Sequence, residues 1–241
     1  MEIHISADFD AMSALAARDF LERLSGIEQP LVLLPSGNSP VGFLKVIREH
    51  FLQTGTRPNW RFIGLDEWVG IGQDEFGSCR EFLDRHLFRR IDIPADRIHF
   101  FNGLATDLDA ERRMAESVVA SHGGIDVAVL GIGTNGHLGL NEPGSDPSLL
   151  SQIVPLAPST IEAARRYFDR PRTVTHGITL GLKTLLASKS IYLLASGHGK
   201  ASIIQRVVEG SLAIDVPGTC LQAHGDCHLY LDTEAASKLT T

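Results

Sequence analysis

Residues 125–143 read IDVAVLGIGTNGHLGLNEP, a short apolar run followed at once by a glycine-rich turn. The run Ile125–Leu130 has the length and the continuous apolar character of a strand that is buried on both faces, as in a parallel sheet. The next six residues, Gly131–Gly136, fit the G-x-G-x-x-G pattern of dinucleotide-binding turns. The stretch therefore indicates an α/β protein in which a polar glycine turn follows a buried strand.

The residues after the third glycine argue against a dinucleotide site. Such a site needs a helix that begins within the motif, and an acidic residue about 20 positions further on to hold the ribose. Here Gly139, Asn141 and Pro143 oppose a helix. No Asp or Glu lies between Pro147 and Thr160. We therefore expect the turn to carry a different chemistry.

Six further apolar runs alternate with segments of helical periodicity. Because the strands are apolar throughout, we predict a single doubly wound α/β domain over residues 1–241, with a mostly parallel sheet and helices on both faces. The Pro- and Ser-rich stretch that begins at Gly144 predicts a lid around residues 144–172. The other expected strands are Ile3–Ala7, Leu31–Leu34, Phe62–Leu65, Ile98–Phe101, Ile191–Ala195 and His228–Leu231, and the expected helices are Met12–Leu24, Val41–Phe51, Arg80–Phe88 and Leu108–Val119.

Composition and charge exclude several classes of protein. The net charge of −7 does not favour binding to nucleic acid or to an anionic membrane. Cys79, Cys220 and Cys227 form neither a CxxC pair nor an even framework, which predicts free thiols in a reducing compartment. The chain shows no signal peptide, no membrane span and no Cys/His cluster with metal-ligand spacing. We expect a cytoplasmic protein without a metal.

Polar side chains follow two of the expected strands directly. The turn quoted above carries His137 and Glu142, and a carboxylate near an imidazole orients it and raises its pKa. Asp66 and Glu67 follow the strand expected at Phe62–Leu65, where a carboxylate beside an apolar wall has a raised pKa and can act as a base. Since ligands of open α/β sheets bind at the carboxyl ends of the strands, these groups favour acid–base chemistry.

Two more strand ends offer groups for an anion. The loop Pro35–Pro40 (PSGNSP) precedes an expected helix and presents backbone N–H groups and hydroxyls. Lys200 follows Gly197 and Gly199 where the strand Ile191–Ala195 gives way to helical residues, and a lysine there can hold a phosphate as a point charge.

Each group also has a structural interpretation. His137 alone is as consistent with a structural histidine, and Lys200 alone with a solvated lysine. Ser39 can serve as an N-cap with Pro40 at the first helical position, and Asp66 as a cap or turn residue. The four strand ends together favour acid–base chemistry on a phosphorylated small molecule.

Three stretches are similar to one known family. LLPSGNSPVGF (33–43), GLDEWVG (64–70) and LGIGTNGHLGLNEPG (130–144) resemble the isomerising hexosamine-6-phosphate deaminases, which share a fold with the 6-phosphogluconolactonases. The resemblance covers about residues 30–235. The stretch 170–200 and Trp68, in place of a tyrosine, resemble galactosamine-6-phosphate deaminase/isomerase more than the common glucosamine enzyme.

The resemblance implies a role for each polar group. Asp66 would move a proton between C2 and C1 of the open-chain sugar. His137 would assist ring opening, with Glu142 orienting it. Asn135 occupies a position that is an aspartate in some members, and an amide cannot relay a proton. The 6-phosphate would bind to the loop Ser36, Gly37, Asn38 and Ser39, to Lys200, and to Arg166, which aligns with a phosphate-binding arginine. A ring-opening acid/base and an enolising base suffice, so no cofactor is expected.

Two other functions are weighed against this one. A 6-phosphogluconolactonase has the same fold, but it usually carries an arginine after the Asp-Glu pair and lacks the NEP that follows the histidine here. A non-catalytic sugar-phosphate sensor of a transcription regulator would carry a DNA-binding module, and this chain begins directly with a strand. The expected partner is a small sugar phosphate, and the sequence leaves both a monomer and a homo-oligomer open.

Overall fold

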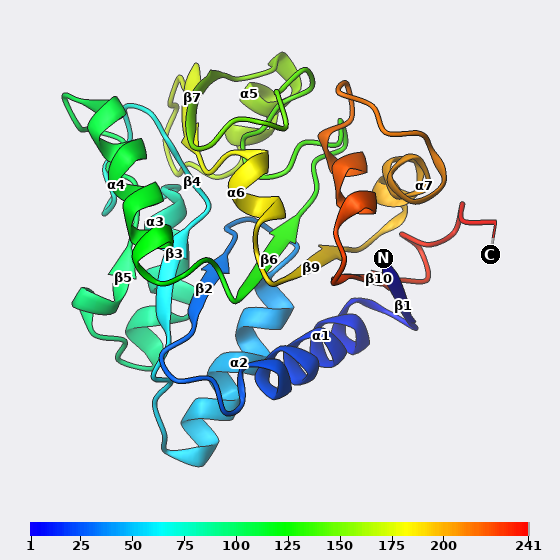
Figure 1. Ribbon diagram of the computed structural model, residues 1–241, viewed down its shortest axis with the longest axis horizontal. Helices are drawn as coiled ribbons and strands as arrows, with labels where there is room; N and C mark the ends of the chain where they lie inside the picture. The colour runs from blue at the N-terminus through cyan, green and yellow to red at the C-terminus, as the bar shows by residue number, and fades with distance from the viewer. Residues whose placement is uncertain (241) are drawn as a thin grey trace.

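Seven strands, one for each apolar run of the sequence, form a parallel sheet in the order β1-β10-β9-β6-β2-β3-β5 (Figure 1). The computed structural model describes residues 1–240. The predicted mostly parallel sheet is confirmed. Its strands are β1 Glu2–Ser6, β2 Leu31–Leu34, β3 Arg61–Gly64, β5 Ile98–His99, β6 Val127–Gly131, β9 Ser190–Ala195 and β10 Cys227–Asp232.

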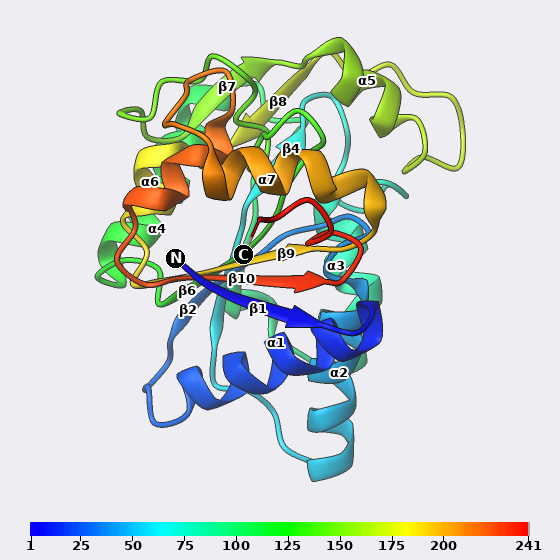
Figure 2. The same ribbon diagram turned by 90° about the vertical axis from the view of Figure 1, so that its right-hand side faces the viewer.

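Helices cover both faces of this sheet, as the doubly wound prediction requires. Alternate residues of one strand enter different apolar layers: Val32 and Leu34 pack with α1, α2 and α3, whereas Leu31 and Leu33 pack with α4, α6 and α7. Figure 2 shows α1 and α2 below the sheet and α7 above it. The helices are α1 Phe9–Leu24, α2 Val41–Thr54, α3 Cys79–His86, α4 Leu108–Ser121, α6 Leu182–Leu186 and α7 Ala201–Glu209, with short 3-10 helices at Phe88–Arg90, Ala95–Arg97, His198–Lys200 and Pro217–Ala223.

Most expected boundaries lie within three residues of those observed: α1 begins at Phe9 rather than Met12, and α2 ends at Thr54 rather than Phe51. Two strands are shorter than expected. The run Ile98–Phe101 pairs only as the two-residue strand β5, and the strand expected to begin at Ile125 begins at Val127. Asp126 lies directly before β6. Its carboxylate accepts a hydrogen bond from the Leu31 backbone N–H and forms an ion pair with Lys189 at 2.7 Å. These contacts fix the backbone at the start of β6.

The start of α2 corrects one structural interpretation. Pro40 is the N-cap of this helix and no side chain caps it, so Ser39 is not the cap. In contrast, Asp8, Ser78 and Asp107 cap α1, α3 and α4 through their side chains. The missing cap leaves the Ser39 hydroxyl available for another partner at the helix N-terminus.

A second, antiparallel sheet was not expected from the sequence. It has the order β4-β8-β7 and comprises β4 Asp66–Trp68, β8 His176–Thr179 and β7 Gln152–Pro155. Together with α5 (Pro158–Ala164) it lies on the α7 side of the main sheet (Figure 2). The segment predicted as a lid thus contains β7 and α5, and its closing motion stays a prediction. Across residues 1–240, no helix combines the length and apolar character required to cross a membrane.

Candidate active site

The glycine turn after β6 folds back on itself instead of entering a helix. The Gly133 N–H donates to the His137 carbonyl at 3.1 Å, and the Gly136 N–H donates to the Gly133 carbonyl at 3.0 Å. A Cβ on Gly133 would lie 2.5 Å from the His137 ring, so the imidazole rests on a position that admits only glycine. The next helix is α5, which begins at Pro158. The turn therefore lacks the helix N-terminus of a dinucleotide site.

His137 belongs to a network of side chains from the turn and from α5. Its Nδ1 lies 3.5 Å from Glu142 Oε2 and 3.4 Å from the Thr160 hydroxyl. Asn135 Nδ2 donates to the same Glu142 oxygen at 3.0 Å, and Asn135 Oδ1 accepts the His137 backbone N–H at 3.2 Å. The Ala157 N–H donates to the other Glu142 oxygen at 3.2 Å. The network fixes the imidazole and joins the turn to α5.

These partners stabilise the negative charge of Glu142. Burial raises the pKa of Glu142, but hydrogen bonds from His137, Thr160 and Asn135 outweigh burial and leave the pKa below its ordinary value. An ionised carboxylate at Nδ1 favours the imidazole tautomer with Nδ1–H, which leaves Nε2 as the free proton acceptor.

Asp66 lies in β4 rather than in a turn or cap, which excludes its structural interpretation. Its side chain is buried, and burial raises its pKa to about 6, although a hydrogen bond from the Cys79 thiol and the nearby His137 oppose the rise. Burial raises the pKa of the Cys79 thiol well above its ordinary value, so the thiol stays protonated and donates. The surroundings of Asp66 therefore keep a carboxyl group that exchanges its proton near neutral pH.

Glu67, the other acid of the pair, faces away from this group and supports α3. Its carboxylate accepts from the Ser78 hydroxyl at 2.6 Å and from the backbone N–H groups of Trp68, Cys79 and Arg80 at 2.9, 3.1 and 3.2 Å. Burial raises its pKa to about 7 against these donors. Since all these partners belong to β4 or to the start of α3, Glu67 ties the two elements together.

The loop Ser36–Ser39 and Lys200 approach the end of β6 from two sides. A Cβ on Gly131 would lie 3.7 Å from Ser39, and Lys200 Nζ donates to the carbonyl of the adjacent Ile132 at 2.6 Å. Burial lowers the pKa of Lys200. Gly37, with φ of 99°, gives the loop a left-handed turn that other residues rarely adopt. Hydroxyls, N–H groups and an ammonium from the loop after β2 and from the residues after β9 thus lie close to the end of β6.

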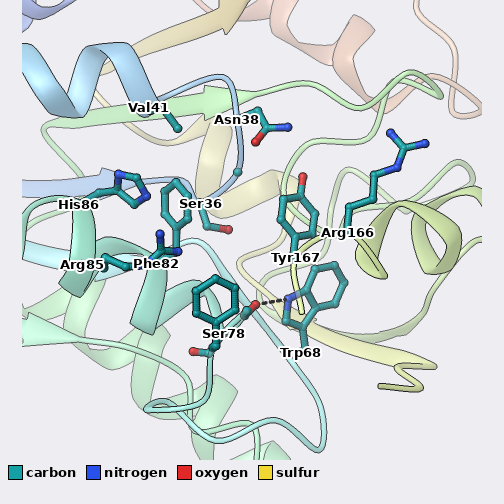
Figure 3. A pocket seen from close by; sticks show the side chains of 13 residues that line it. Ser36, Asn38, Val41, Trp68, Ser78, Phe82, Arg85, His86, Arg166 and Tyr167 are labelled. Carbon is teal, nitrogen blue, oxygen red and sulfur yellow. Dashed lines mark hydrogen bonds between the residues drawn. The ribbon is translucent and has the colours of Figure 1, made fainter. Parts of the chain in front are cut away.

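A cavity of about 270 Å³ opens beside this loop (Figure 3). Ser36, Asn38 and Arg166 line it, and the Tyr167 hydroxyl faces the loop, 3.5 Å from a Cβ on Gly37. The Trp68 indole N–H donates to the Gly77 carbonyl at 3.1 Å, which fixes this wall of the cavity. His137 and Lys200 are not part of the cavity wall. Arg166 is exposed at its rim.

Three further side chains lie beside the candidate site residues and had not been expected there from the sequence. Thr160 reaches His137 from the predicted lid, and the Cys79 thiol stands between Asp66 and the Ser36 hydroxyl, which donates to its sulfur at 3.2 Å. Tyr167 was not singled out. No local motif marks them, because each lies far along the chain from its partner.

Asn141, which shares the turn with His137, is buried and donates hydrogen bonds to the carbonyls of Leu138 and Leu180, so it stabilises the turn itself.

Comparisons with known proteins show which family the chain belongs to. The family model of glucosamine-6-phosphate isomerases and 6-phosphogluconolactonases matches residues 7–229. The chain belongs to this family. A glucosamine-6-phosphate deaminase of Streptococcus suis (strain 05ZYH33) is 40% identical over 241 residues, which covers 99% of this chain and 100% of the relative. One from Geobacillus sp. (strain WCH70) is 37% identical over 242 residues, with 98% and 95% covered.

Solved structures of the family show the same fold. A monomeric glucosamine-6-phosphate deaminase superposes with a TM-score of 0.95 at 32% identity and covers 99% of this chain and 100% of its own. A 6-phosphogluconolactonase from Trypanosoma brucei superposes with a TM-score of 0.76 at 19% identity, covering 99% and 98%. The family resemblance noted in the sequence is therefore confirmed. The similarity to the 6-phosphogluconolactonase shows the fold alone.

Proposed function

We propose that this protein catalyses the isomerising deamination of an amino sugar 6-phosphate, which yields the ketose 6-phosphate and ammonia. The observation that carries the proposal is the pairing of a buried carboxyl group, Asp66, with the imidazole network of His137 at one end of the sheet. The family's deaminase relatives, which match nearly the whole chain, support it.

Ring opening is the step that suits His137. The pyranose ring opens when a proton leaves the C1 hydroxyl and another reaches the ring oxygen, and an imidazole can both accept and donate at neutral pH. Glu142 at Nδ1 stabilises the charge that appears on the imidazole when Nε2 takes the proton. Asn135 cannot relay protons, and its role is to hold Glu142 through the 3.0 Å hydrogen bond.

Asp66 suits the proton transfer that follows. The C2 hydrogen is acidic once the C1 aldehyde is free. Asp66 removes it, and the C1 carbonyl oxygen gains a proton, which gives an enolamine with a C1=C2 double bond. Asp66 then returns its proton to C1 while the nitrogen loses one proton, which turns the enolamine into an imine at C2. Water adds to this C=N bond, and ammonia leaves as the C2 ketone forms. A base with a pKa of about 6 is strong enough to take the proton and weak enough to return it near neutral pH.

The phosphate group binds, in this proposal, between the loop Ser36–Ser39 and Lys200. The uncapped N-terminus of α2 offers N–H groups to an anion, and the Ser39 hydroxyl and Lys200 ammonium lie on both sides of the end of β6. Arg166 at the rim of the cavity adds a cation when the segment 144–172 closes as a lid. Neither the binding of the phosphate nor the proton transfers require an organic cofactor.

The substrate epimer is the finer part of the proposal. The relatives are named for glucosamine 6-phosphate, whereas Trp68 and the stretch 170–200 resemble the galactosamine enzymes. Trp68 lies in the cavity wall. We propose glucosamine 6-phosphate as the main substrate and expect Trp68 to govern how well the C4 epimer is accepted.

One set of assays tests the function. The purified chain is given glucosamine 6-phosphate, galactosamine 6-phosphate and 6-phosphogluconolactone, and ammonia, ketose phosphate and lactone hydrolysis are measured. Ammonia and ketose 6-phosphate formed in equal amounts support the proposal. Lactone hydrolysis without ammonia would make the protein a lactonase, and tight sugar-phosphate binding without turnover would make it a sensor. Light scattering on the same preparation tests whether the chain forms a homo-oligomer.

A further inference from the structure

A second polar cluster lies at the opposite end of the sheet from the candidate active site. Parallel pairing of β1 with β10 places Glu2 beside His228 and His4 beside Tyr230, all on the face that α1 covers. The His4 ring stacks on Tyr230 with the ring centroids 4.7 Å apart. Within residues 1–240, Glu2, His4 and His228 are the group whose ligand atoms lie close enough to hold one metal ion.

The separations in this group match the edges of a tetrahedral metal site. His4 Nε2 lies 3.2 Å from His228 Nδ1, and the Glu2 oxygens lie 3.6 Å from His4 Nε2 and 3.5 Å from His228 Nδ1. Two ligands at the usual zinc distances of about 2.0–2.2 Å and a tetrahedral angle stand about 3.3–3.6 Å apart. Oε1 of Glu2 makes the contact with His4 and Oε2 makes the contact with His228. The two imidazole nitrogens and the Glu2 carboxylate are therefore spaced so that a zinc ion fits with little movement.

Asp226 sets the histidine tautomer that such a site needs. His228 Nε2 lies 2.8 Å from Asp226 Oδ1 and 3.5 Å from an Arg23 nitrogen, so the shorter contact assigns it as a donor to the carboxylate. When His228 Nε2–H donates its hydrogen bond to Asp226, Nδ1 carries no proton and its lone pair points at His4. A carboxylate behind a ligating histidine is the usual outer partner in metal sites.

The cluster is accessible, and it is separate from the reaction. A cavity of about 340 Å³, lined by Glu2, His4, His228 and residues of α1, β9 and β10, opens onto it. The side chains of His4 and His228 are 21% and 14% exposed, so an ion can enter and keep water as a fourth ligand. The candidate active site lies at the carboxyl ends of the strands, whereas Glu2 begins β1.

We propose that Glu2, His4 and His228 form a binding site for one divalent transition-metal ion of the zinc class. Two imidazoles and a carboxylate suit zinc, whereas magnesium and calcium take oxygen ligands. The bound ion joins the N-terminal strand to β10 and so stabilises the edge of the main sheet. No metal-ligand spacing marks these residues in the sequence, because they come from opposite ends of the chain. The alternative is that the two histidines form a hydrogen bond with each other and bind no metal ion.

Metal binding to the full, untagged chain tests this proposal. After chelator treatment, the protein is dialysed against Zn²⁺ or Mg²⁺, metal content is measured, and Zn²⁺ is titrated calorimetrically. We expect one zinc per chain, no stoichiometric magnesium, and a higher thermal unfolding midpoint with zinc. Co²⁺ should give visible bands without a thiolate charge-transfer band, because no cysteine is a ligand. A wild-type chain that takes up no zinc would overturn the proposal and leave the shared hydrogen bond.

Variants locate the site. Glu2→Gln and His4→Gln should each weaken zinc binding at least about 10-fold, and Asp226→Asn about 10–100-fold. The exposed His50 of α2 serves as a control, since His50→Gln should leave zinc affinity unchanged. Glu2 is 66% exposed, so its variant keeps the fold and decides the matter if His4→Gln unfolds. Zinc binding that is unaffected by Glu2→Gln and His4→Gln would contradict the assignment.

Discussion

The two sides of β4 give adjacent carboxyl groups different surroundings. Glu67 accepts four hydrogen bonds from Ser78 and three backbone N–H groups, whereas Asp66 faces the Cys79 thiol and His137 on the side of the candidate active site. A carboxylate surrounded by donors from its own fold is fixed in place. One that is buried with few donors can exchange its proton with a ligand. Neighbours in three dimensions, rather than neighbours in the sequence, separate a structural acid from a candidate base.

The largest effect is expected for Asp66→Asn. The amide keeps the shape but cannot accept the C2 proton, so kcat for ammonia release should fall about 10³-fold, within the range for one acid–base group. The thermal unfolding midpoint should change little, because the amide oxygen can still accept the hydrogen bond from the Cys79 thiol. A coupled ammonia assay and a melting curve measure both. A kcat within a few-fold of wild type would remove Asp66 from the reaction.

His137→Gln tests whether the imidazole serves a different step from Asp66. We expect turnover of the cyclic sugar to fall about 10²-fold, because ring opening loses its acid and base. A substrate analogue locked in the open-chain form should lose much less. Steady-state rates on both compounds give the comparison. Equal losses on both would place His137 in the proton transfer between C2 and C1.

Glu67→Gln tests the structural side of the strand. A glutamine has one acceptor oxygen and brings an NH₂ group toward donors, so the free energy of unfolding should fall by about 2–3 kcal/mol. Turnover of the folded fraction should stay within a few-fold of wild type. Denaturant unfolding and kcat at a permissive temperature measure this. A folded, fully stable variant with little activity would show that Glu67 is the base and that Asp66 has the structural role.

Lys200→Ala tests the phosphate contact on the far side of the site. Loss of the ammonium beside the end of β6 should raise KM for the sugar phosphate about 10-fold, with a smaller change in kcat. Lys183→Ala, which removes an exposed lysine of α6, is the matched control. If KM is unchanged in both variants, Lys200 does not bind the phosphate.

The two carboxyl groups should also differ in their effects of pH. Asp66 must be ionised to act, so kcat/KM should fall about tenfold per pH unit below about 6. The pKa of Glu67 is raised in the folded state, so the stability it contributes is complete below about pH 4.5 and is lost as the pH rises through about 7. Glu67→Gln should remove that part of the pH dependence of unfolding while it leaves the kcat/KM profile in place. A profile that is flat near pH 6 would contradict the assignment of Asp66.

Much of the fold could be predicted from the sequence because the main sheet has a strong local signal. Apolar runs buried on both faces identified all seven parallel strands. The antiparallel sheet escaped prediction, since Asp66–Trp68 and Gln152–Pro155 form strands only by pairing with His176–Thr179. Local patterns do not reveal such pairing between distant segments.

The same limit applies to the sites. Residues at strand ends, such as His137 and Lys200, stood out because the sheet brings strand ends together. Cys79 and Thr160 did not, since only the packing of α3 and α5 brings them to Asp66 and His137. The cluster around His228 joins both ends of the chain and had no local motif at all.

Exchange of the substrate's C2 hydrogen with deuterated solvent shows whether Asp66 or Glu67 is the base. Wild type, Asp66→Asn and Glu67→Gln are each incubated with glucosamine 6-phosphate in D₂O, and deuterium at the carbon skeleton is followed by NMR. We expect exchange in wild type and Glu67→Gln and its loss in Asp66→Asn. Near-normal exchange in folded Asp66→Asn, or its loss in folded Glu67→Gln, would show that Asp66 is not the base.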